Sequence, residues 1–351
     1  MFIMRNNNYY CIIMAGGMGR RFWPYSRKQL PKQFLDFFGC GQTLLRQTYD
    51  RYKKIIPAEN IYITTHRDYV SLVTEILPEF NKEQLIVEEE RRNTAPSLAY
   101  ASHVIYQKNE DATVVIAPSD HLILNLDEFE KSILEGMEFA ATSQKLVNVG
   151  IKPTRPETGY GYIQIDDEAK EGNFYKVKTF IEKPALEFAE VFMNSNEFYW
   201  NSGIFIWHIK TILKAFHENL SEVCPKLESD HPDFSTCPNA SIDMSIMEKS
   251  DNVYVQICHF GWADLGTWES LYDASPKDKD QNVIINSNTL LYNCKNNLVL
   301  MPKGKVAVVD GLENYLIAAH KDVLLICKKD DKNAIRKYVN DIELKLGEKF
   351  I

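Results

Sequence analysis

Apolar runs alternate with helix-like segments over the first 120 residues of the chain. The runs at 10–14 and 113–117 are long enough for buried strands and too short for helices. Between them, Thr43 is a suitable N-terminal cap for a segment whose apolar positions follow a helical period. Strands that alternate with helices predict βαβ units and a mostly parallel sheet. The expected strands are 10–14, 61–64, 85–87 and 113–117, and the expected helices are 44–55, 69–77 and 96–106.

The pattern changes in the second half of the chain. From about residue 150 to 265, β-like runs are separated by turns, and helices are expected only at 185–194 and 208–218. A helix at 267–275 is followed by a predicted hinge at 276–280, which divides the chain into domains of residues 1–280 and 281–351. The smaller domain is expected to be β-rich, with strands at 283–285, 289–291, 298–300, 305–309, 315–318 and 323–327 and a helix at 332–344.

A glycine-rich turn follows the first apolar run. Ala15-Gly16-Gly17-Met18-Gly19 allows the backbone to bend tightly and to approach a ligand closely, because glycine has no side chain. The cations that follow within one short segment are Arg20, Arg21, Arg27, Lys28 and Lys32. Free backbone N–H groups beside several cations suit a polyphosphate, so the pattern predicts a nucleotide-phosphate loop. The alternative is a surface hairpin whose charges are solvated.

Two well-known phosphate loops do not fit this segment. A P-loop requires a Lys-Ser/Thr pair directly after its last glycine, whereas Arg20-Arg21 stands here. A dinucleotide-binding turn leads straight into a helix, and Pro24 and Pro31 disfavour a long helix at this point. In a parallel sheet, ligands bind beyond the carboxyl ends of the strands. The glycine turn and Asp120 both follow apolar runs, and we therefore expect them at one rim.

Composition and charge exclude several classes of function. Of the 351 residues, 45% are hydrophobic and 25% are charged, as in an ordinary globular protein. A net charge of −8 argues against a nucleic-acid partner, and no apolar run reaches the roughly 20 residues of a membrane span. No secretory signal is recognisable, so a cytoplasmic location is expected. The seven cysteines and eight histidines show no spacing suited to zinc, which leaves a hard cation, Mg²⁺, as the expected metal.

The residues around the glycine turn resemble a known signature. G-G-x-G-x-R-x-W-P-x-S-R from Gly16 to Arg27, followed by P-K-Q-F from Pro31, is similar to the signature of the sugar-nucleotide pyrophosphorylases, above all the mannose-1-phosphate guanylyltransferases. Met18 and Arg20 depart from the usual residues, but both fall between signature positions. The resemblance implies a Rossmann-like nucleotidyltransferase domain with a mixed, mostly parallel sheet. It also implies a small β-helix-like C-terminal domain involved in packing or dimerisation, and hence a homodimer.

A second motif, Arg91-Arg92-Asn93-Thr94-Ala95-Pro96, resembles the R-N-T-A-P motif that lies against the nucleobase in this family. Asparagine and threonine offer donors and acceptors to a purine edge, and Pro96 suits the first turn of a helix. The alternative is a helix cap in which Thr94 is the N-cap residue. The nucleotide-binding residues that the resemblance implies are Ala15, Gly16, Gly17, Gly19, Arg20, Arg92, Asn93, Thr94, Pro96 and Ser119.

Two carboxylates match the metal-binding positions of the family. Asp120 follows the apolar run at 113–117, where an ordinary turn residue would be the alternative. Asp264 lies in G-W-A-D-L-G-T-W, which is similar to the family's G-W-x-D-x-G-[ST]-W. The resemblance implies that both hold Mg²⁺ against the triphosphate, and that Arg21 and Lys32 stabilise the leaving pyrophosphate.

Three further motifs resemble the sugar site of the family. They are E-T-G-Y-G-Y-I at 157–163, E-K-P at 182–184 and W-N-S-G at 200–203. The resemblance implies that Lys183 holds the sugar phosphate, although an exposed Glu-Lys ion pair is the alternative. Asp243 also fits the family pattern, either in the site or as structural support. The implied sugar-binding residues are Thr158, Gly159, Tyr160, Glu182, Asn201 and Ser202.

The matches run in order from residue 11 to about 268. The implied reaction converts GTP and α-D-mannose 1-phosphate to GDP-mannose and pyrophosphate by in-line attack on the α-phosphorus. One alternative is the same chemistry with another hexose 1-phosphate or nucleotide. Another is a catalytically silent subunit that senses nucleotide sugars, which would be expected to lack Lys32, Asp120 or Asp264. A dinucleotide-dependent oxidoreductase is disfavoured by Pro24.

Overall fold

A computed structural model describes residues 6–229, 232–329 and 334–351, without the side chain of Arg20. Packing divides these residues into two compact units, and each unit is assembled from three separate segments. Unit 1 contains the described parts of Met1–Gly16, Thr48–Ser119 and Ile123–Trp262, and unit 2 contains those of Gly17–Gln47, Asp120–Leu122 and Ala263–Ile351. The chain thus crosses between the units inside the glycine turn and beside each of the two aspartates.

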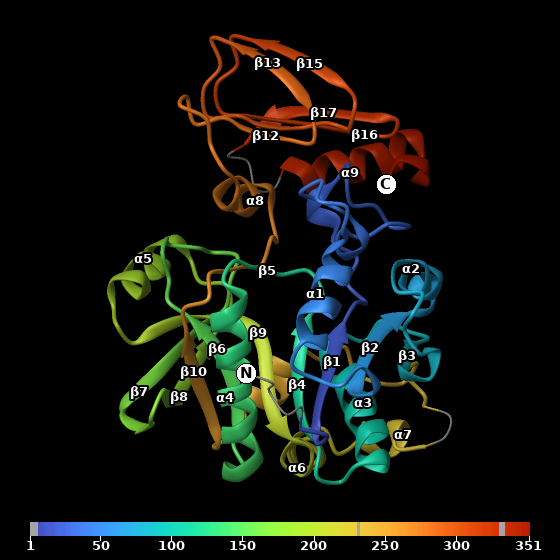
Figure 1. Cartoon of the computed structure of the whole chain (residues 1–351), viewed down its shortest axis with the longest axis vertical. Helices are drawn as coiled ribbons and strands as arrows, with labels where there is room; N and C mark the ends of the chain where they lie inside the picture. Colours follow the sequence, from blue (N-terminus) through green and yellow to red (C-terminus); the bar gives the residue numbers. More distant parts are fainter. Residues whose placement is uncertain (1–5, 230–231, 330–333) are drawn as a thin grey trace. The chain divides into compact units, whose positions relative to one another are not determined.

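Unit 1 is built on one nine-stranded sheet with the order β3-β2-β1-β4-β9-β6-β10-β8-β7 (Figure 1). Its strands are β1 (Tyr9–Met14), β2 (Ile61–His66), β3 (Leu85–Glu88), β4 (Thr113–Pro118), β6 (Leu146–Ile151), β7 (Tyr162–Glu171), β8 (Phe174–Ile181), β9 (Phe198–His208) and β10 (Val253–Cys258). Short strands β5 (Leu122–Ile123) and β11 (Trp262–Ala263) each contain a crossing between the units.

The first four strands confirm the expected parallel arrangement. β1 pairs in parallel with both β2 and β4, and β2 pairs in parallel with β3. The remainder of the sheet is mixed, because β9 runs antiparallel to β4 and β6, and β8 runs antiparallel to β7 and β10. A two-residue turn between β7 and β8 returns the chain beside itself, and such short connections produce antiparallel pairs. The expectation of a mostly parallel sheet therefore holds only for this first part.

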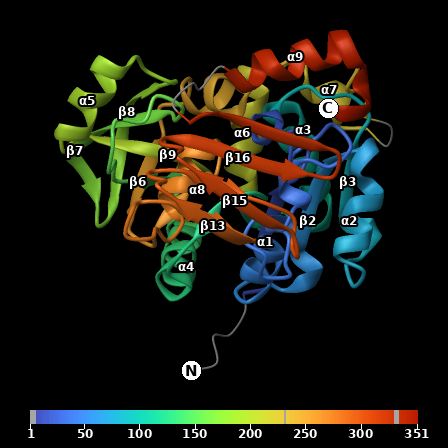
Figure 2. The same cartoon turned by 90° about the horizontal axis from the view of Figure 1, so that it is seen from above.

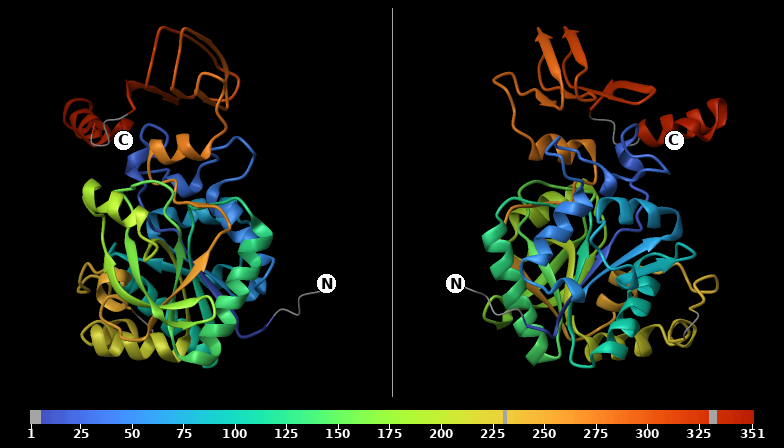
Figure 3. Two further views of the ribbon diagram at one scale, coloured as in Figure 1. Left: turned by 90° about the vertical axis from the view of Figure 1, so that its left-hand side faces the viewer. Right: turned by 45° about the vertical axis from the view of Figure 1, so that its right-hand side comes forward.

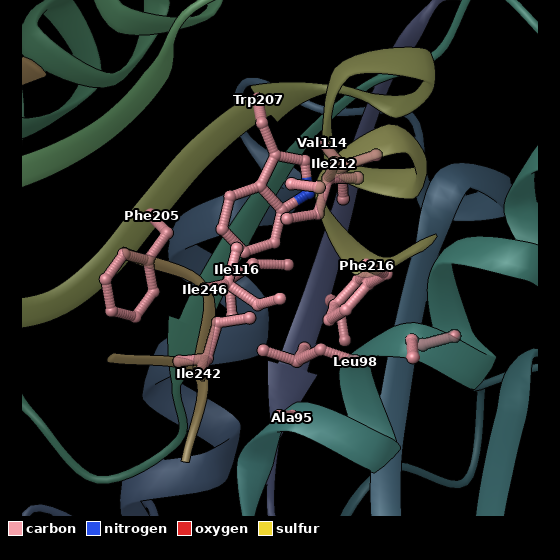
Figure 4. Packing of buried hydrophobic residues seen from close by; sticks show 14 of the residues in the cluster. Ala95, Leu98, Val114, Ile116, Phe205, Trp207, Ile212, Phe216, Ile242 and Ile246 are labelled. Atoms are coloured by element: carbon pink, nitrogen blue, oxygen red, sulfur yellow. The ribbon is translucent and has the colours of Figure 1, made fainter. Parts of the chain in front are cut away.

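Successive side chains of β9 face opposite sides of the sheet, and both sides are covered by helices. Phe205 and Trp207 belong to a cluster with residues of α3 and α6, where Trp207 points toward Ile212 (Figure 4). Ile206 lies on the other face, where helix α4 packs against β9 and β4. This alternation is the period of an extended strand, and burial on both faces explains the continuous apolar runs. The helices of unit 1 are α2 (Val70–Ile76), α3 (Thr94–Lys108), α4 (Leu126–Ser143), α5 (Leu186–Asn194), α6 (Ile209–Asn219) and α7 (Cys224–Leu227), and α1 (Leu44–Lys53) begins in unit 2.

The C-terminal part of unit 2 consists of short ladders. β12 (Val283–Ile285), β14 (Leu298–Leu300) and β16 (Tyr315–His320) pair in parallel, and β17 (Val323–Lys328) closes this sheet in the antiparallel direction. A second sheet pairs β13 (Asn288–Tyr292) in parallel with β15 (Val306–Asp310), side by side in Figure 2. Consecutive strands alternate between the two sheets, so the chain advances by parallel coils from β12 to β16. The C-terminal region is therefore rich in sheet, as expected.

The hydrophobic core of unit 2 joins residues that are far apart in the sequence. Phe22, Trp23 and Leu44 share one cluster with Leu298 and Leu316 of the C-terminal sheet. The same cluster includes helix α8 (Trp268–Ala274) and the inner side of helix α9 (Ala334–Leu346). The indole N–H of Trp23 donates to the Phe350 carbonyl over 2.8 Å. In both views of Figure 3, the red C-terminal helix lies beside a blue segment of the early chain, in agreement with the packing of α9 on the 3₁₀ turn Arg20–Phe22.

Among the residues that the structure describes, no helix combines the length and the apolar character that a membrane crossing requires.

Candidate functional site

The carboxyl ends of β1, β2 and β4 meet at one rim of the unit 1 sheet. The amide of Ala15 donates to the Thr64 carbonyl over 2.8 Å, and that of Ser119 donates to the Met14 carbonyl over 3.2 Å. Gly16 continues this rim, and a Cβ atom added there would lie 3.7 Å from Oε1 of Glu88. Ala15, Gly16 and Ser119, which were expected to bind nucleotide, are thus neighbours at the rim of unit 1.

The rest of the glycine turn belongs to unit 2 and is fixed by its own contacts. The Gly17 carbonyl accepts a hydrogen bond of 2.8 Å from the side-chain amide of Gln33. Gly19 has a φ of +56°, and an added Cβ would lie 3.0 Å from Oγ of Ser26 and 3.1 Å from the amide nitrogen of Lys32. Both the positive φ and the lack of space require glycine at this position. The backbone of Arg20 and Arg21 continues into the 3₁₀ turn Arg20–Phe22.

Lys32 is the centre of the polar cluster in unit 2. Its side chain is buried, and its ammonium lies 3.0 Å from Oδ2 of Asp120. The same ammonium donates over 2.9 Å to the carbonyl oxygens of Asp264 and of Leu265. Leu265 itself has a φ of 43°, which is an unfavourable conformation for a residue with a side chain. This strained residue is part of the segment that presents the two carbonyls to Lys32. An ammonium has three N–H donors, so all the donors of Lys32 have partners.

The two aspartates have different environments. Burial alone would raise the pKa of Asp120, but the positive charges of Lys32 and His121 outweigh it and hold the pKa of that carboxyl below its usual value. Oδ1 of Asp264 is buried and has no hydrogen-bond partner in the described structure. A buried polar atom without a partner is costly, and a carboxylate oxygen is the kind of ligand that Mg²⁺ takes. The donor set of Asp120 and Asp264 therefore fits a hard cation.

A cavity of about 540 Å³ in unit 2 is lined by the polar residues described above. Lys32, Asp120 and Asp264 line it together with Arg21. The cavity thus brings together the four residues that the resemblance implied for the leaving pyrophosphate and the metal. Its other lining residues are Met18, Gly19, Phe22, Gly266, Arg336, Val339 and Asn340.

Two of the cations after the glycine turn have structural partners instead. The guanidinium of Arg27 is buried and donates to the His320 carbonyl over 3.0 Å and to Asp322 over 2.7 Å. Lys28 forms an exposed ion pair of 3.2 Å with Glu348. Of the five cations that suit a polyphosphate in the sequence, Arg27 and Lys28 thus connect the early segment to the C-terminal region.

The R-N-T-A-P motif starts helix α3 in unit 1. Asn93, at a φ of 67°, is the N-cap residue, and its side chain accepts from the amide of Thr94 over 2.9 Å. The hydroxyl of Thr94 accepts instead from the amide of Ile242 over 2.9 Å. The alternative with Thr94 as the cap is therefore wrong by one residue. Pro96 lies buried in the first turn, and the Arg92 guanidinium donates to the Ser235 carbonyl.

The first of the sugar motifs is organised around an aromatic group in unit 1. The ring of Tyr160 meets the rings of Trp200 and Trp262 edge to face, with centroids 5.2 Å apart in both pairs. The amide of Gly159 donates to Oε1 of Glu157 over 2.8 Å, which fixes the turn that contains Thr158. This arrangement holds the turn rigidly, and it leaves Thr158 partly exposed.

The other two sugar motifs meet at Gly161. A Cβ atom there would lie 3.2 Å from Oε2 of Glu182 and 3.5 Å from Cβ of Asn201, so the absent side chain lets these residues approach. Lys183, at a φ of 44°, forms an ion pair with Glu182. The hydroxyl of Ser202 is buried and donates to the Val149 carbonyl over 2.6 Å, and it holds the strand together.

Asn201 is held by a chain of amide and carboxylate groups. Its side-chain oxygen accepts from Asn148 over 2.8 Å, and its side-chain nitrogen donates to Oδ1 of Asp243 over 2.7 Å. Burial raises the pKa of Asp243, although the bond from Asn201 and the charge of Lys183 oppose it. Because a carboxylate only accepts hydrogen bonds, Asp243 fixes the orientation of the Asn201 amide, with its nitrogen toward Asp243 and its oxygen toward Asn148.

A pH-dependent effect on stability is expected from Asp243→Asn. The pKa of Asp243 is raised on folding, so the folded state favours the protonated carboxyl. The free energy of unfolding therefore falls as the pH rises through the native pKa of Asp243. The uncharged variant avoids this cost and retains an acceptor for Asn201. Urea denaturation at pH 4 and pH 7 should show that the variant gains on the parent chain at the higher pH. Asp251→Asn, on the surface, is the control, and an equal difference at both pH values would contradict the expectation.

Gly266 leaves the space that the Asp264 carboxylate occupies. A Cβ atom added at Gly266 would collide with Oδ1 of Asp264. Because the end of a side chain can move, Gly266→Ala is expected to displace the carboxylate, lowering kcat by about 10²-fold with little change in Tm. Steady-state kinetics and thermal unfolding measure the two effects. If displacement is the cause, Asp264→Ala and the double variant will have the same activity; a further loss in the double variant would contradict it.

Sequence motifs left three neighbours of these groups unassigned. Glu88 is buried beside Gly16 and accepts from Ser97 over 2.6 Å, and Asn148 lies beneath Asn201. Arg336 of α9 lines the cavity with the two aspartates. Only Glu88 had a local signal, namely a carboxylate at the end of β3. Asn148 and Arg336 are far in the sequence from the groups that they approach.

Among the described residues, one group of possible metal ligands lies outside the motifs. Ligand atoms of His217, Cys224 and Glu228 lie within 4.8 Å of one another. Nε2 of His217 pairs with Glu228 over 3.0 Å, and the Cys224 thiol donates to the Leu220 carbonyl. Burial raises the pKa of Cys224 to about 11, which keeps the thiol protonated. Ordinary packing accounts for this group.

Comparisons with known proteins agree on one family. The model of the nucleotidyl transferase family matches residues 10–281. A mannose-1-phosphate guanylyltransferase of Escherichia coli is 32% identical over 95% of this chain and 75% of its own length, and one of Salmonella muenchen is 35% identical over 94% and 72%. Among solved structures, a Thermus thermophilus protein described as mannose-1-phosphate geranyltransferase matches with a TM-score of 0.88 and 29% identity, over 96% of this chain and 99% of that one.

Proposed function

Since the chain belongs to the mannose-1-phosphate guanylyltransferase family of the nucleotidyl transferases, we propose that it converts GTP and α-D-mannose 1-phosphate to GDP-mannose and pyrophosphate. The observation that carries the proposal is the cluster of Lys32, Asp120 and Asp264 in the cavity beside the glycine turn. This cluster has the polar groups that nucleotidyl transfer needs around a triphosphate. Since the reaction draws on GTP, the cytoplasm is the proposed compartment.

In the proposed reaction, an oxygen of the sugar phosphate attacks the α-phosphorus of GTP in line. The new P–O bond joins the sugar phosphate to GMP, and the α–β P–O bond breaks and releases pyrophosphate. The residues contribute mainly orientation and charge. Lys183 holds the sugar phosphate, Glu182 and Asn201 accept or donate at the sugar hydroxyls, and Arg21 faces the leaving phosphates.

Lys32 receives a more specific role than the sequence suggested. Its three donors are occupied by Asp120 and by two backbone carbonyls. We therefore assign it to holding the segment around Asp264 in place and keeping Asp120 ionised. Asp120 and Asp264 would hold Mg²⁺, since one offers an ionised carboxylate and the other a buried oxygen without a partner in the described structure. The cation supplies neutralisation of the phosphate charge when it is bound.

The parallel coils of the C-terminal region support a short β-helix, and we propose that this region carries the dimer contact. The outward faces of β13 and β15 expose Leu290, Tyr292, Val306 and Val308, which is unusual for a surface in water. Light scattering during size-exclusion chromatography measures the mass directly. A monomer at micromolar concentration would contradict the homodimer.

The proposed reaction is tested by pyrophosphate release from the purified full chain in the presence of Mg²⁺. GTP, ATP, UTP and dTTP are each combined with the 1-phosphates of mannose, glucose and fucose. Release confined to GTP with mannose 1-phosphate is the expected result. Release with another pair would correct the substrate and keep the chemistry. Calorimetric binding of nucleotide sugars without any release would overturn the proposal in favour of a silent, sensing subunit.

A further inference from the structure

We infer that the C-terminal helix α9 forms part of the phosphate site, with Arg336 binding the β- and γ-phosphates of GTP and the pyrophosphate product. The inference rests on the proposed function, because it assigns a further residue to the same cavity. It also gives the C-terminal region a role in substrate binding, in addition to packing.

The first support is the position of the helix. Arg336, Val339 and Asn340 line the same cavity as Lys32, Asp120 and Asp264. The three helix residues are spaced by three and four positions and therefore lie on one face. Ile335, Tyr338, Val339 and Ile342 pack against the core of unit 2, which fixes the backbone from which Arg336 extends. The guanidinium is thus carried beside the cavity by a fixed element.

The second support is the charge in the cavity. A triphosphate needs several positive groups, but Lys32 already pairs with Asp120 and two carbonyls, and Arg27 and Lys28 have partners elsewhere. Arg21 and Arg336 remain in the lining. Within the described ranges, neither guanidinium forms a hydrogen bond or an ion pair. Arginine presents parallel donors that match two phosphate oxygens. Asn340 adds an uncharged donor beside Arg336.

The contrasting explanation is that Arg336 only balances the two aspartates. In that case, removing Arg336 would weaken the binding of GTP and of mannose 1-phosphate by the same factor. A phosphate-binding residue instead acts on the ligands that carry the β- and γ-phosphates, and spares mannose 1-phosphate. The affinity for inorganic pyrophosphate separates the two explanations.

The experiment compares the full-length parent with Arg336→Ala, Arg336→Gln, Arg336→Lys and Lys337→Ala. Lys337 is the control, because it is an exposed cation on the same helix and does not line the cavity. The alanine and glutamine variants are expected to raise the KM for GTP and the Kd for Mg-pyrophosphate by about tenfold to a hundredfold. The KM for mannose 1-phosphate should stay within about twofold, and lysine should restore part of the loss because it supplies the charge without the paired donors.

Isothermal titration with Mg-pyrophosphate measures binding without turnover, so it remains decisive even if the parent forms no GDP-mannose. Unchanged pyrophosphate affinity in folded Arg336→Ala and Arg336→Gln variants would overturn the inference and leave the proposed function intact. Equal losses for GTP and mannose 1-phosphate would also overturn it in favour of charge balance. Failure of the parent in every nucleotide and sugar combination would overturn the proposed function alone. Circular dichroism confirms that each variant is folded.

Discussion

Replacing Asp264 with alanine is expected to lower kcat for GDP-mannose formation by about 10²- to 10³-fold without unfolding the protein. The carboxylate lines the cavity with Lys32 and Asp120, and its Oδ1 is buried without a partner in the described part of the chain. Removing such a group relieves a desolvation cost, so stability should be unchanged or slightly higher. The proposed Mg²⁺ site loses one of its two carboxylates at the same time. Steady-state kinetics and urea denaturation measure the two consequences.

The shape-conserving variant Asp264→Asn separates charge from packing. It should lose nearly as much activity as the alanine variant, because an amide is a weaker ligand for Mg²⁺ than a carboxylate. Asp280→Ala removes an exposed carboxylate from the same unit and should leave kcat unchanged. Unchanged turnover in Asp264→Ala would remove the basis for the assigned metal site.

Lys32→Met is expected to lower both activity and stability. Its ammonium satisfies the carbonyls of Asp264 and Leu265 and pairs with Asp120 in a buried position. Leaving these acceptors without a donor should cost about 1–3 kcal/mol in the free energy of unfolding. The segment around Asp264 loses its anchor, and kcat should fall by about 10²-fold. Methionine keeps most of the volume, which limits the effect of a cavity.

The pH dependence of Lys32→Met follows from Asp120. In the parent chain the native pKa of this carboxyl lies below its unfolded value, so it stabilises the fold at neutral pH and loses this effect as the pH falls through the native pKa. In the variant, burial would dominate and raise the pKa, so the sign reverses. The stability gap between variant and parent should widen as the pH rises from 4 to 7. Lys28→Met, which removes an exposed ion pair, is the control, and a gap independent of pH would contradict this account.

Local signals predicted many of the helices and strands. β1 begins one residue before the apolar run at 10–14, and the expected helix at 267–275 is α8, which starts with a capping box between Thr267 and Ser270. Asn93 and Pro96 mark the start of α3 in the same way. These features depend on residues that are close in the sequence. Helix α4 was not predicted, although Asn125 caps it.

Features that depend on distant residues left no such signal. Arg27 and Lys28 resemble phosphate-binding cations in the sequence, because their partners Asp322 and Glu348 lie 295 and 320 positions later. The resemblance implied a sugar contact for Ser202, and no local pattern indicates that its buried hydroxyl donates to the Val149 carbonyl. The charge at Arg336 is evident from the sequence, but its place in the lining of the same cavity as Asp120 and Asp264 is not. The predicted boundary at 280 reflects a change in pattern, which does not reveal which segments share a core.

The shared core of unit 2 bears on how this enzyme could be recombined with its relatives. Phe22, Trp23 and Leu44 are packed against Leu298 and Leu316, and the Trp23 indole is bonded to the last helical turn of the chain. A chimera joined at residue 280 would pack one parent's early segment against another parent's C-terminal strands, and the mismatch would fall in this shared core. Exchanges that move 17–47 together with 263–351 keep the two halves of this core from the same parent. Because Asp120 also lines the cavity, an exchange that preserves the cavity has to move residues 120–122 together with these two segments. The C-terminal region therefore cannot be exchanged on its own.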